Sequence, residues 1–90
     1  EIPFLINKNL DLYKGFIVLG CIIRGETYHF ELIANEVTRK IMDLSIFSKK
    51  PIGYGILTCN NQEQALIRSD PSKGNKGREA AIACIESLKK

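Results

Sequence analysis

Two apolar runs stand out along the chain. Residues 16–19 are an unbroken apolar stretch, and residues 52–58 (Ile-Gly-Tyr-Gly-Ile-Leu-Thr) form a second one that two glycines weaken. A strand with one wet face alternates apolar and polar residues, whereas a strand buried on both faces is continuously apolar. The pattern therefore predicts two strands of a parallel sheet, each covered on both faces.

Between these runs the apolar spacing changes to that of a helix. Apolar residues recur every three or four positions at Phe30, Ala34, Val37, Ile41 and Leu44, and polar residues occupy the other faces. We predict an amphipathic helix over about residues 27–47 that stops before Pro51. The opening residues 1–12 predict a short loop and then a helical turn.

The region after the second run predicts two shorter helices. Asn60 is a candidate N-cap, with Glu63 three residues later, for a helix that runs through Arg68. Residues 70–77 are rich in glycine and polar residues and predict a loop. A last helix follows, with one apolar stripe formed by Ala81, Cys84, Ile85 and Leu88.

This order of strand, helix, strand, helix, helix predicts an α/β fold with right-handed parallel crossovers. The 90 residues allow at most one small domain, which we place over the whole range 1–90. Two strands are too few for a stable parallel sheet with both faces covered. We therefore expect further strands ahead of Glu1.

Charge and composition narrow the classes of function. The net charge of +3 is small and its cations are scattered, which argues against a nucleic-acid partner. The longest apolar run is too short to span a bilayer, and no signal peptide precedes it, so we expect no membrane association and a cytoplasmic location. We expect three free, buried cysteine thiols, whose spacing together with one histidine predicts no metal site.

Candidate chemistry lies beyond the end of the first strand. Residues 21–29 carry a glycine, a hydroxyl group and free amides at a helix start, which favours an anion such as phosphate. His29, in the first helical turn, is either a proton carrier for such a site or a surface or capping residue. Tyr54 is either part of the hydrophobic core or part of the candidate binding site. Arg68 and Lys76 are either solvated charges or a pair of phosphate ligands.

Several stretches together resemble lumazine synthase, the enzyme of the penultimate step of riboflavin biosynthesis. They include residues 19–30 (Leu-Gly-Cys-Ile-Ile-Arg-Gly-Glu-Thr-Tyr-His-Phe), 53–58 (Gly-Tyr-Gly-Ile-Leu-Thr) and 74–77 (Gly-Asn-Lys-Gly). The resemblance implies a three-layer α/β sandwich around a central parallel sheet of flavodoxin-like order. It also implies that the family continues upstream of Glu1, so that this domain is N-terminally incomplete.

The reaction that the resemblance implies joins a ribitylamino-pyrimidine to dihydroxybutanone phosphate, releasing phosphate and water, without a metal or an organic cofactor. His29 matches the family's proton donor and acceptor. Glu26 and Thr27 match the phosphate-side loop, Arg68 the phosphate-binding arginine and Lys76 a lysine near that phosphate.

The resemblance assigns the pyrimidine side as well. Cys21, Ile22 and Ile23 match the backbone that contacts the pyrimidine, and Glu1 matches a glutamate that holds the ribityl chain. Tyr54 stands where the family often has a phenylalanine that the neighbouring subunit supplies. The added hydroxyl group leaves the aromatic face intact, so we expect binding to survive.

The implied partners are the two small substrates, other copies of the chain and riboflavin synthase. The family forms pentamers or 60-subunit shells with active sites between subunits, and the sequence leaves the choice open. An inactive fragment or a non-catalytic assembly subunit of the same fold is the alternative. A phosphopeptide- or nucleotide-binding module has only the anion site in its favour.

Overall fold

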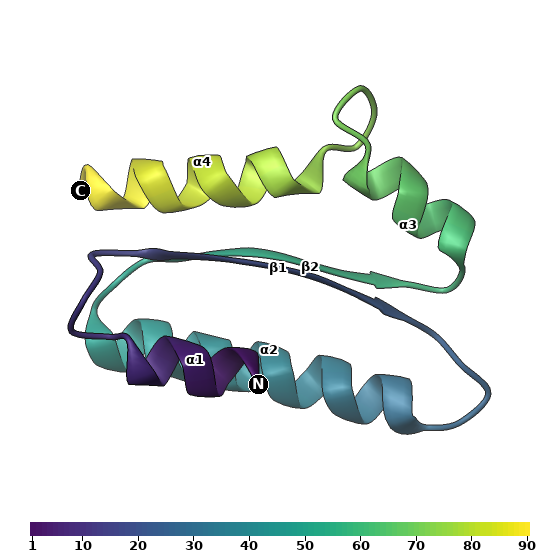
Figure 1. Cartoon of the computed structure of the whole chain (residues 1–90), viewed down its shortest axis with the longest axis horizontal. Coiled ribbons are helices and arrows are strands. Elements are labelled where there is room, and N and C mark those ends of the chain that lie inside the picture. The colour runs from purple at the N-terminus through teal and green to yellow at the C-terminus, as the bar shows by residue number, and fades with distance from the viewer.

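The computed structural model describes all 90 residues as a parallel two-stranded sheet between two layers of helices (Figure 1). The strands are β1 (Phe16–Ile23) and β2 (Ile52–Cys59). One face of the sheet carries α1 (Ile2–Lys8) and α2 (His29–Ser48), and the other carries α3 (Gln62–Ser69) and α4 (Lys76–Leu88). The predicted three-layer α/β sandwich with a central parallel sheet is confirmed. None of the helices is both long enough and apolar enough to cross a membrane.

The two strands pair in parallel along their whole length. The register runs from Phe16 opposite Ile52 to Ile23 opposite Cys59. One further backbone hydrogen bond, from Arg24 N to the carbonyl of Cys59 (2.8 Å), extends the ladder beyond β1. Because parallel strands point the same way, the carboxyl ends of β1 and β2 lie at one edge of the sheet.

Helix α2 confirms the predicted amphipathic segment. It begins two residues later than predicted and ends one residue later, at a Lys49 cap in the left-handed conformation (φ 60°). The five predicted apolar positions are all buried or half-buried, and Ile41 is 4% exposed. Ile41 packs with Ile6, Val18 and Ile56 in the core cluster between the sheet and this helix layer.

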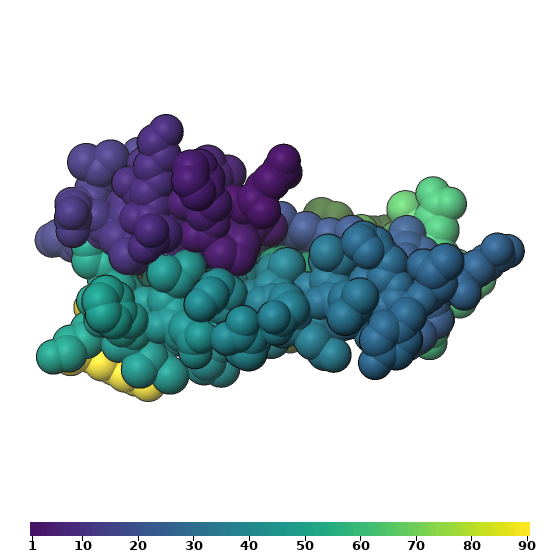
Figure 2. All heavy atoms as spheres, turned by 90° about the horizontal axis from the view of Figure 1, so that it is seen from below, coloured from purple at the N-terminus to yellow at the C-terminus, as the bar shows by residue number.

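The predicted helical turn of the opening segment is confirmed, but it begins earlier than predicted and replaces the expected short loop. Residues from Ile2 to Lys8 form α1, which lies beside α2 on the same face of the sheet (Figure 2). Pro3 does not prevent this helix, because the first turn has no intrahelical partner for its N–H groups. Ile6 fixes α1 in place through its burial in the core.

The prediction that the first strand is buried on both faces is wrong for this chain. Of its apolar residues only Val18 is fully buried, whereas Ile17, Leu19 and Ile23 remain 46, 60 and 44% exposed. These three side chains alternate with Val18 and belong to the face that carries α3 and α4. The cause is the placement of α4, which packs mainly over β2 and leaves β1 partly uncovered at its unpaired edge.

Close packing between β2 and α4 depends on two glycines. A methyl group at Gly53 would stand 2.0 Å from the carbonyl oxygen of Ala80, and one at Gly55 would stand 3.1 Å from the Ala80 side chain. The buried residues of α4 are Ala80 and Cys84. The predicted stripe is therefore displaced, because Ile85 and Leu88 are about half exposed.

The predicted cap of the third helix lies one residue too early. Asn61, not Asn60, is the N-cap of α3, and its side chain accepts a hydrogen bond from Gln64 N (2.9 Å). Gln64 in turn accepts from the backbone N–H of Asn60 (2.8 Å). This reciprocal arrangement satisfies two free amides and places the end of β2 firmly against the helix start.

The glycine packing yields a stability prediction. Gly53→Ala forces the β2 backbone and α4 apart, and we expect it to lower the free energy of unfolding by about 2 kcal/mol or more. Gly77→Ala is the matched control, because an added methyl group meets only Leu19 at 4.0 Å within a helix, where alanine is favoured over glycine by about 0.5–1 kcal/mol. Urea unfolding followed by circular dichroism measures both. Equal stability of the two variants would contradict the packing argument.

Candidate functional site

The junction between β1 and α2 holds most of the predicted site residues. Residues 24–28 link the carboxyl end of β1 to the first turn of α2, and Gly25, Glu26 and Thr27 are all exposed. His29 is the first helical residue, and its N–H lies 3.4 Å from Thr27 Oγ1. The remaining amides at this helix start are free, and the helix dipole adds positive potential there. The junction can therefore accept an anion beside an imidazole.

The predicted cations lie elsewhere, on the α3–α4 side. Arg68, in the last turn of α3, and Lys76, at the start of α4, line an open groove of about 440 Å³ together with Tyr54 and Glu79. The Arg68 guanidinium turns back toward β2 and approaches Gln64 Oε1 (3.4 Å) and Cys59 Sγ (3.5 Å). The Lys76 ammonium pairs with Glu79 at 2.9 Å. Two cations in one groove can hold a phosphate.

The end of β1 supplies the third predicted group. Cys21, Ile22 and Ile23 pair with β2 through their backbone, and Ile22 is half-buried. Cys21 is exposed, which corrects the prediction that all three thiols are buried, whereas Cys59 and Cys84 are buried. All three cysteines are unpaired. Partial desolvation raises the pKa of the Cys21 thiol, and the neighbouring Cys59 thiol raises that pKa further.

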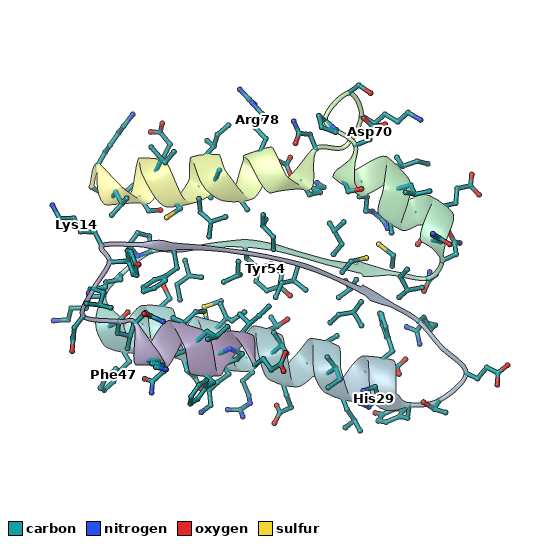
Figure 3. All side chains as sticks on the ribbon, in the orientation of Figure 1. Lys14, His29, Phe47, Tyr54, Asp70 and Arg78 are labelled. Atoms are coloured by element: carbon teal, nitrogen blue, oxygen red, sulfur yellow. The ribbon has the colours of Figure 1, made fainter.

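The predicted residues thus form separate groups within one chain. Helix α2, which begins with His29, lies on one face of the sheet, whereas α3 and α4, which carry Arg68 and Lys76, lie on the other (Figure 3). Glu1 precedes α1 and makes no side-chain cap to that helix. A single chain brings Tyr54, Arg68 and Lys76 into one groove, and none of these three residues forms a hydrogen bond or ion pair with His29.

Tyr54 is neither enclosed core nor a free side chain. It is 40% exposed, and its hydroxyl group forms a hydrogen bond of 2.7 Å with Thr38 Oγ1 on α2. This partner was not predicted from the sequence, although a hydroxyl group at a strand position where an apolar ring is common was a signal that a second polar group lies nearby. The bond fixes the direction of the ring relative to α2.

Arg24 is a second residue for which the sequence predicted no role. Its guanidinium pairs with Glu31 on α2, donates through Nε to Asn60 Oδ1 (3.1 Å) and lies 4.5 Å from the centroid of the Phe30 ring. The hydrogen bond from Arg24 lowers the pKa of the Glu31 carboxyl group. The only signal in the sequence was a cation between the strand and the glycine of the loop.

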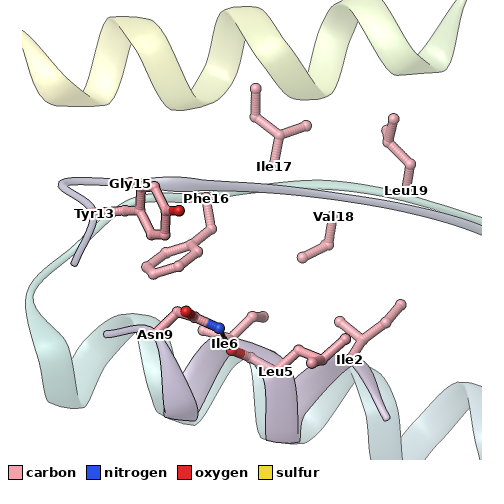
Figure 4. Close-up of a pocket in the computed structure, with 10 residues that line it drawn as sticks. All are labelled: Ile2, Leu5, Ile6, Asn9, Tyr13, Gly15, Phe16, Ile17, Val18 and Leu19. Carbon is pink, nitrogen blue, oxygen red and sulfur yellow. Dashed lines mark hydrogen bonds between the residues drawn. The ribbon is translucent and has the colours of Figure 1, made fainter. Parts of the chain in front are cut away.

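A further hollow, lined mainly by apolar side chains, contains none of the predicted site residues. It measures about 520 Å³ and lies between α1 and the outer edge of β1 (Figure 4). Its lining is largely apolar. Val18 points from β1 toward the layer of α1 and α2, whereas Ile17 and Leu19 point toward α4. With few polar groups it lacks the means to orient a phosphate or a polar pyrimidine. Nowhere do three histidine, cysteine or acidic side chains gather in a way that could hold a metal ion.

Differential exposure of the thiols yields a second prediction. Under native conditions we expect iodoacetamide to label Cys21 first, while Cys59 and Cys84 react only after unfolding. Because the Cys21 pKa is raised, the labelling rate should keep rising with pH above the range of an ordinary thiol. Peptide mass spectrometry after timed labelling measures this. Labelling of Cys59 as fast as Cys21 in the native protein would contradict the structure.

Comparison of the sequence with known proteins identifies its family. The family model for 6,7-dimethyl-8-ribityllumazine synthase matches residues 1–90. A protein of that name from Bartonella tribocorum is 48% identical over all of this chain, which spans 63% of that relative's length. The Agrobacterium fabrum protein is 47% identical, with 100% of this chain and 68% of the relative covered, and the Zymomonas mobilis protein is 51% identical, with 94% and 62% covered. The chain belongs to the 6,7-dimethyl-8-ribityllumazine synthase family.

Proposed function

We propose that the protein condenses 5-amino-6-(ribitylamino)uracil with 3,4-dihydroxy-2-butanone 4-phosphate to give 6,7-dimethyl-8-ribityllumazine, phosphate and water. The observation that carries the proposal is the family match along the whole chain, with His29 at the junction of β1 and α2. On this proposal the protein is a transferase of riboflavin biosynthesis.

The phosphate of the four-carbon substrate is bound by cations and backbone amides. Arg68 carries a planar fork of N–H donors that matches two phosphate oxygens, and Lys76 adds a second positive charge in the same groove. The free amides of residues 25–27, with the side chains of Glu26 and Thr27, form the loop on the phosphate side. Together these groups stabilise the negative charge of the departing phosphate.

His29 transfers the protons of the reaction. Imine formation requires a proton to leave the attacking amine, and elimination of phosphate requires another proton transfer. An imidazole serves both directions near neutral pH, because its ordinary pKa lies close to that range. His29 is exposed at the helix start, where a bound substrate can reach it. Alignment of the two substrates supplies much of the remaining acceleration.

The pyrimidine lies along the end of β1. Backbone groups of Cys21, Ile22 and Ile23 contact the ring, and Glu1 binds the ribityl hydroxyl groups. Since the contact at position 21 is made by the backbone, a cysteine side chain is compatible with it. Tyr54 offers an aromatic face whose direction Thr38 fixes.

We further propose that the complete site forms between two copies of the chain in a homo-oligomer. Separation of His29 from the groove of Tyr54, Arg68 and Lys76 supports this arrangement, because one copy would supply the histidine and its neighbour the cations. Large exposed apolar side chains, including Phe47 at 83% and Ile46 at 70%, also favour burial against other copies. The proposals of a cytoplasmic location and of riboflavin synthase as a partner depend on the family resemblance alone.

Substitution of the histidine tests the assigned chemistry. We expect His29→Ala to slow formation of the lumazine product by about 100-fold while the assembly state stays unchanged, because the side chain is exposed. The product is followed by its absorbance, and assembly by analytical ultracentrifugation. Tyr28→Phe, at the neighbouring exposed residue, is the control for disturbance of the helix start. Wild-type turnover in His29→Ala would remove His29 from the mechanism and favour a non-catalytic assembly subunit.

Mixing of variants tests the shared site. Arg68→Ala and His29→Ala should each be nearly inactive alone. After joint refolding of equal amounts, about a quarter of the sites should combine an intact His29 from one copy with an intact Arg68 from its neighbour. Activity should then return to about a quarter of the wild-type value. The absence of any recovery, with mixed assembly confirmed by mass spectrometry, would place both residues in sites made by single chains.

A further inference from the structure

Arg24, directly after β1, makes the one ion pair of the molecule that reaches beyond a single helix and its cap. Its partner Glu31 lies on α2, whereas the other ion pairs join residues three or four positions apart within one helix or between a helix and its C-cap. The same guanidinium donates to Asn60 after β2 (3.1 Å) and lies over the Phe30 ring at 4.5 Å. Its backbone N–H continues the sheet ladder by donating to the Cys59 carbonyl. Arg24 therefore connects the ends of both strands to the first turn of α2.

The loop that follows Arg24 has little support of its own. Gly25 and Glu26 form no hydrogen bond within the chain, and the Thr27 hydroxyl group contacts only the nearby His29 N–H. Nothing lies within 4 Å of a methyl group placed on Gly25. The position of the loop amides is therefore set by the two ends of the loop, and Arg24 is the residue that joins those ends.

We propose that Arg24 is a positioning residue that holds the amides of residues 25–28 and His29 at a fixed distance from the strand ends. This inference rests on the proposed lumazine synthase function. An arginine suits the task because its planar fork can serve Asn60 and Glu31 at once while its face covers Phe30. Arg24 is itself engaged by these three partners, so it acts on phosphate through the loop and not by direct binding.

The ionised form of Glu31 stabilises its ion pair with Arg24. Hydrogen bonding from Arg24 lowers the pKa of the Glu31 carboxyl group, which favours its ionised form. Glu31 is only 28% exposed, and its place in the first helical turn is favourable for a negative charge. Lysine in place of Arg24 keeps one charge but cannot reproduce the three-way contact.

Kinetics of the full chain in its native assembly test the proposal. We expect Arg24→Gln to lower kcat/KM for the butanone phosphate by about 10- to 100-fold, with a smaller change in KM for the pyrimidine, because the loop amides lose their alignment. Arg24→Lys should lower kcat/KM for the butanone phosphate by more than half as much as Arg24→Gln does, when both changes are expressed as logarithms. Glu31→Gln added to Arg24→Gln should cost nothing more, because both changes break the same link.

Arg39→Gln is the matched control. Arg39 forms its ion pairs with Glu36 and Asp43 on its own helix, and it lines the same hollow between α2 and β2 as Arg24. Its loss should leave both KM values and kcat unchanged. A fall in kcat/KM equal to that of Arg24→Gln would show a general effect of surface charge and would overturn the proposal.

Hydrogen exchange gives a readout that does not need activity. In Arg24→Gln the amides of His29 and Leu32, which are hydrogen-bonded to the Thr27 hydroxyl group and to the Tyr28 carbonyl, should exchange at least about 5-fold faster, while amides of the paired strands keep their protection. Unchanged loop exchange and unchanged kinetics would overturn the positioning role. If the wild-type protein made no lumazine, the proposed function would fall, and the exchange result would still decide whether Arg24 holds the loop.

Discussion

Parallel pairing of β1 with β2 is the constraint on which the rest of the structure depends. Eight residue pairs in register bring the carboxyl ends of the strands, at Ile23 and Cys59, to one edge of the sheet. Each strand there leads into a helix, α2 after β1 and α3 after β2, and the two helices begin on opposite faces. One edge thus presents a helix start with free amides on one face and a short helix with an arginine on the other. A slip in register would separate these features.

The parts of the fold that were predictable are those in which a pattern repeats many times. Helix α2 repeats its apolar spacing over five positions, and all five face the core. Short helices repeat their apolar spacing too few times for the pattern to predict their bounds and their buried face. The start of α1 was predicted as a short loop, and the stripe of α4 was displaced because two glycines on β2 let Ala80 approach closely. The exposure of Ile17 and Leu19 depends on where α4 lies over the sheet, which is a property of tertiary packing.

The residues of the candidate site were predicted from the sequence, and the structure adds their arrangement. The motif around residues 23–29 predicts an anion-binding junction because glycine, hydroxyl and histidine stand in series before a helix. Sequence distance, however, does not show on which face of the sheet Arg68 and Lys76 lie relative to His29. Contacts such as Thr38 with Tyr54, or Arg24 with Asn60, depend on side-chain conformations across elements far apart in the chain. No periodicity predicts such contacts.

The placement of the histidine and the cation groove on opposite layers has a genetic consequence in the shared-site arrangement that we propose. Each chain would then serve two catalytic centres, giving His29 to one and Arg68 with Lys76 to the other. A copy that still assembled but was defective on both layers would impair two centres, one on each of its sides, whereas a lesion on one layer would impair only one. Two alleles with lesions on different layers would instead complement each other.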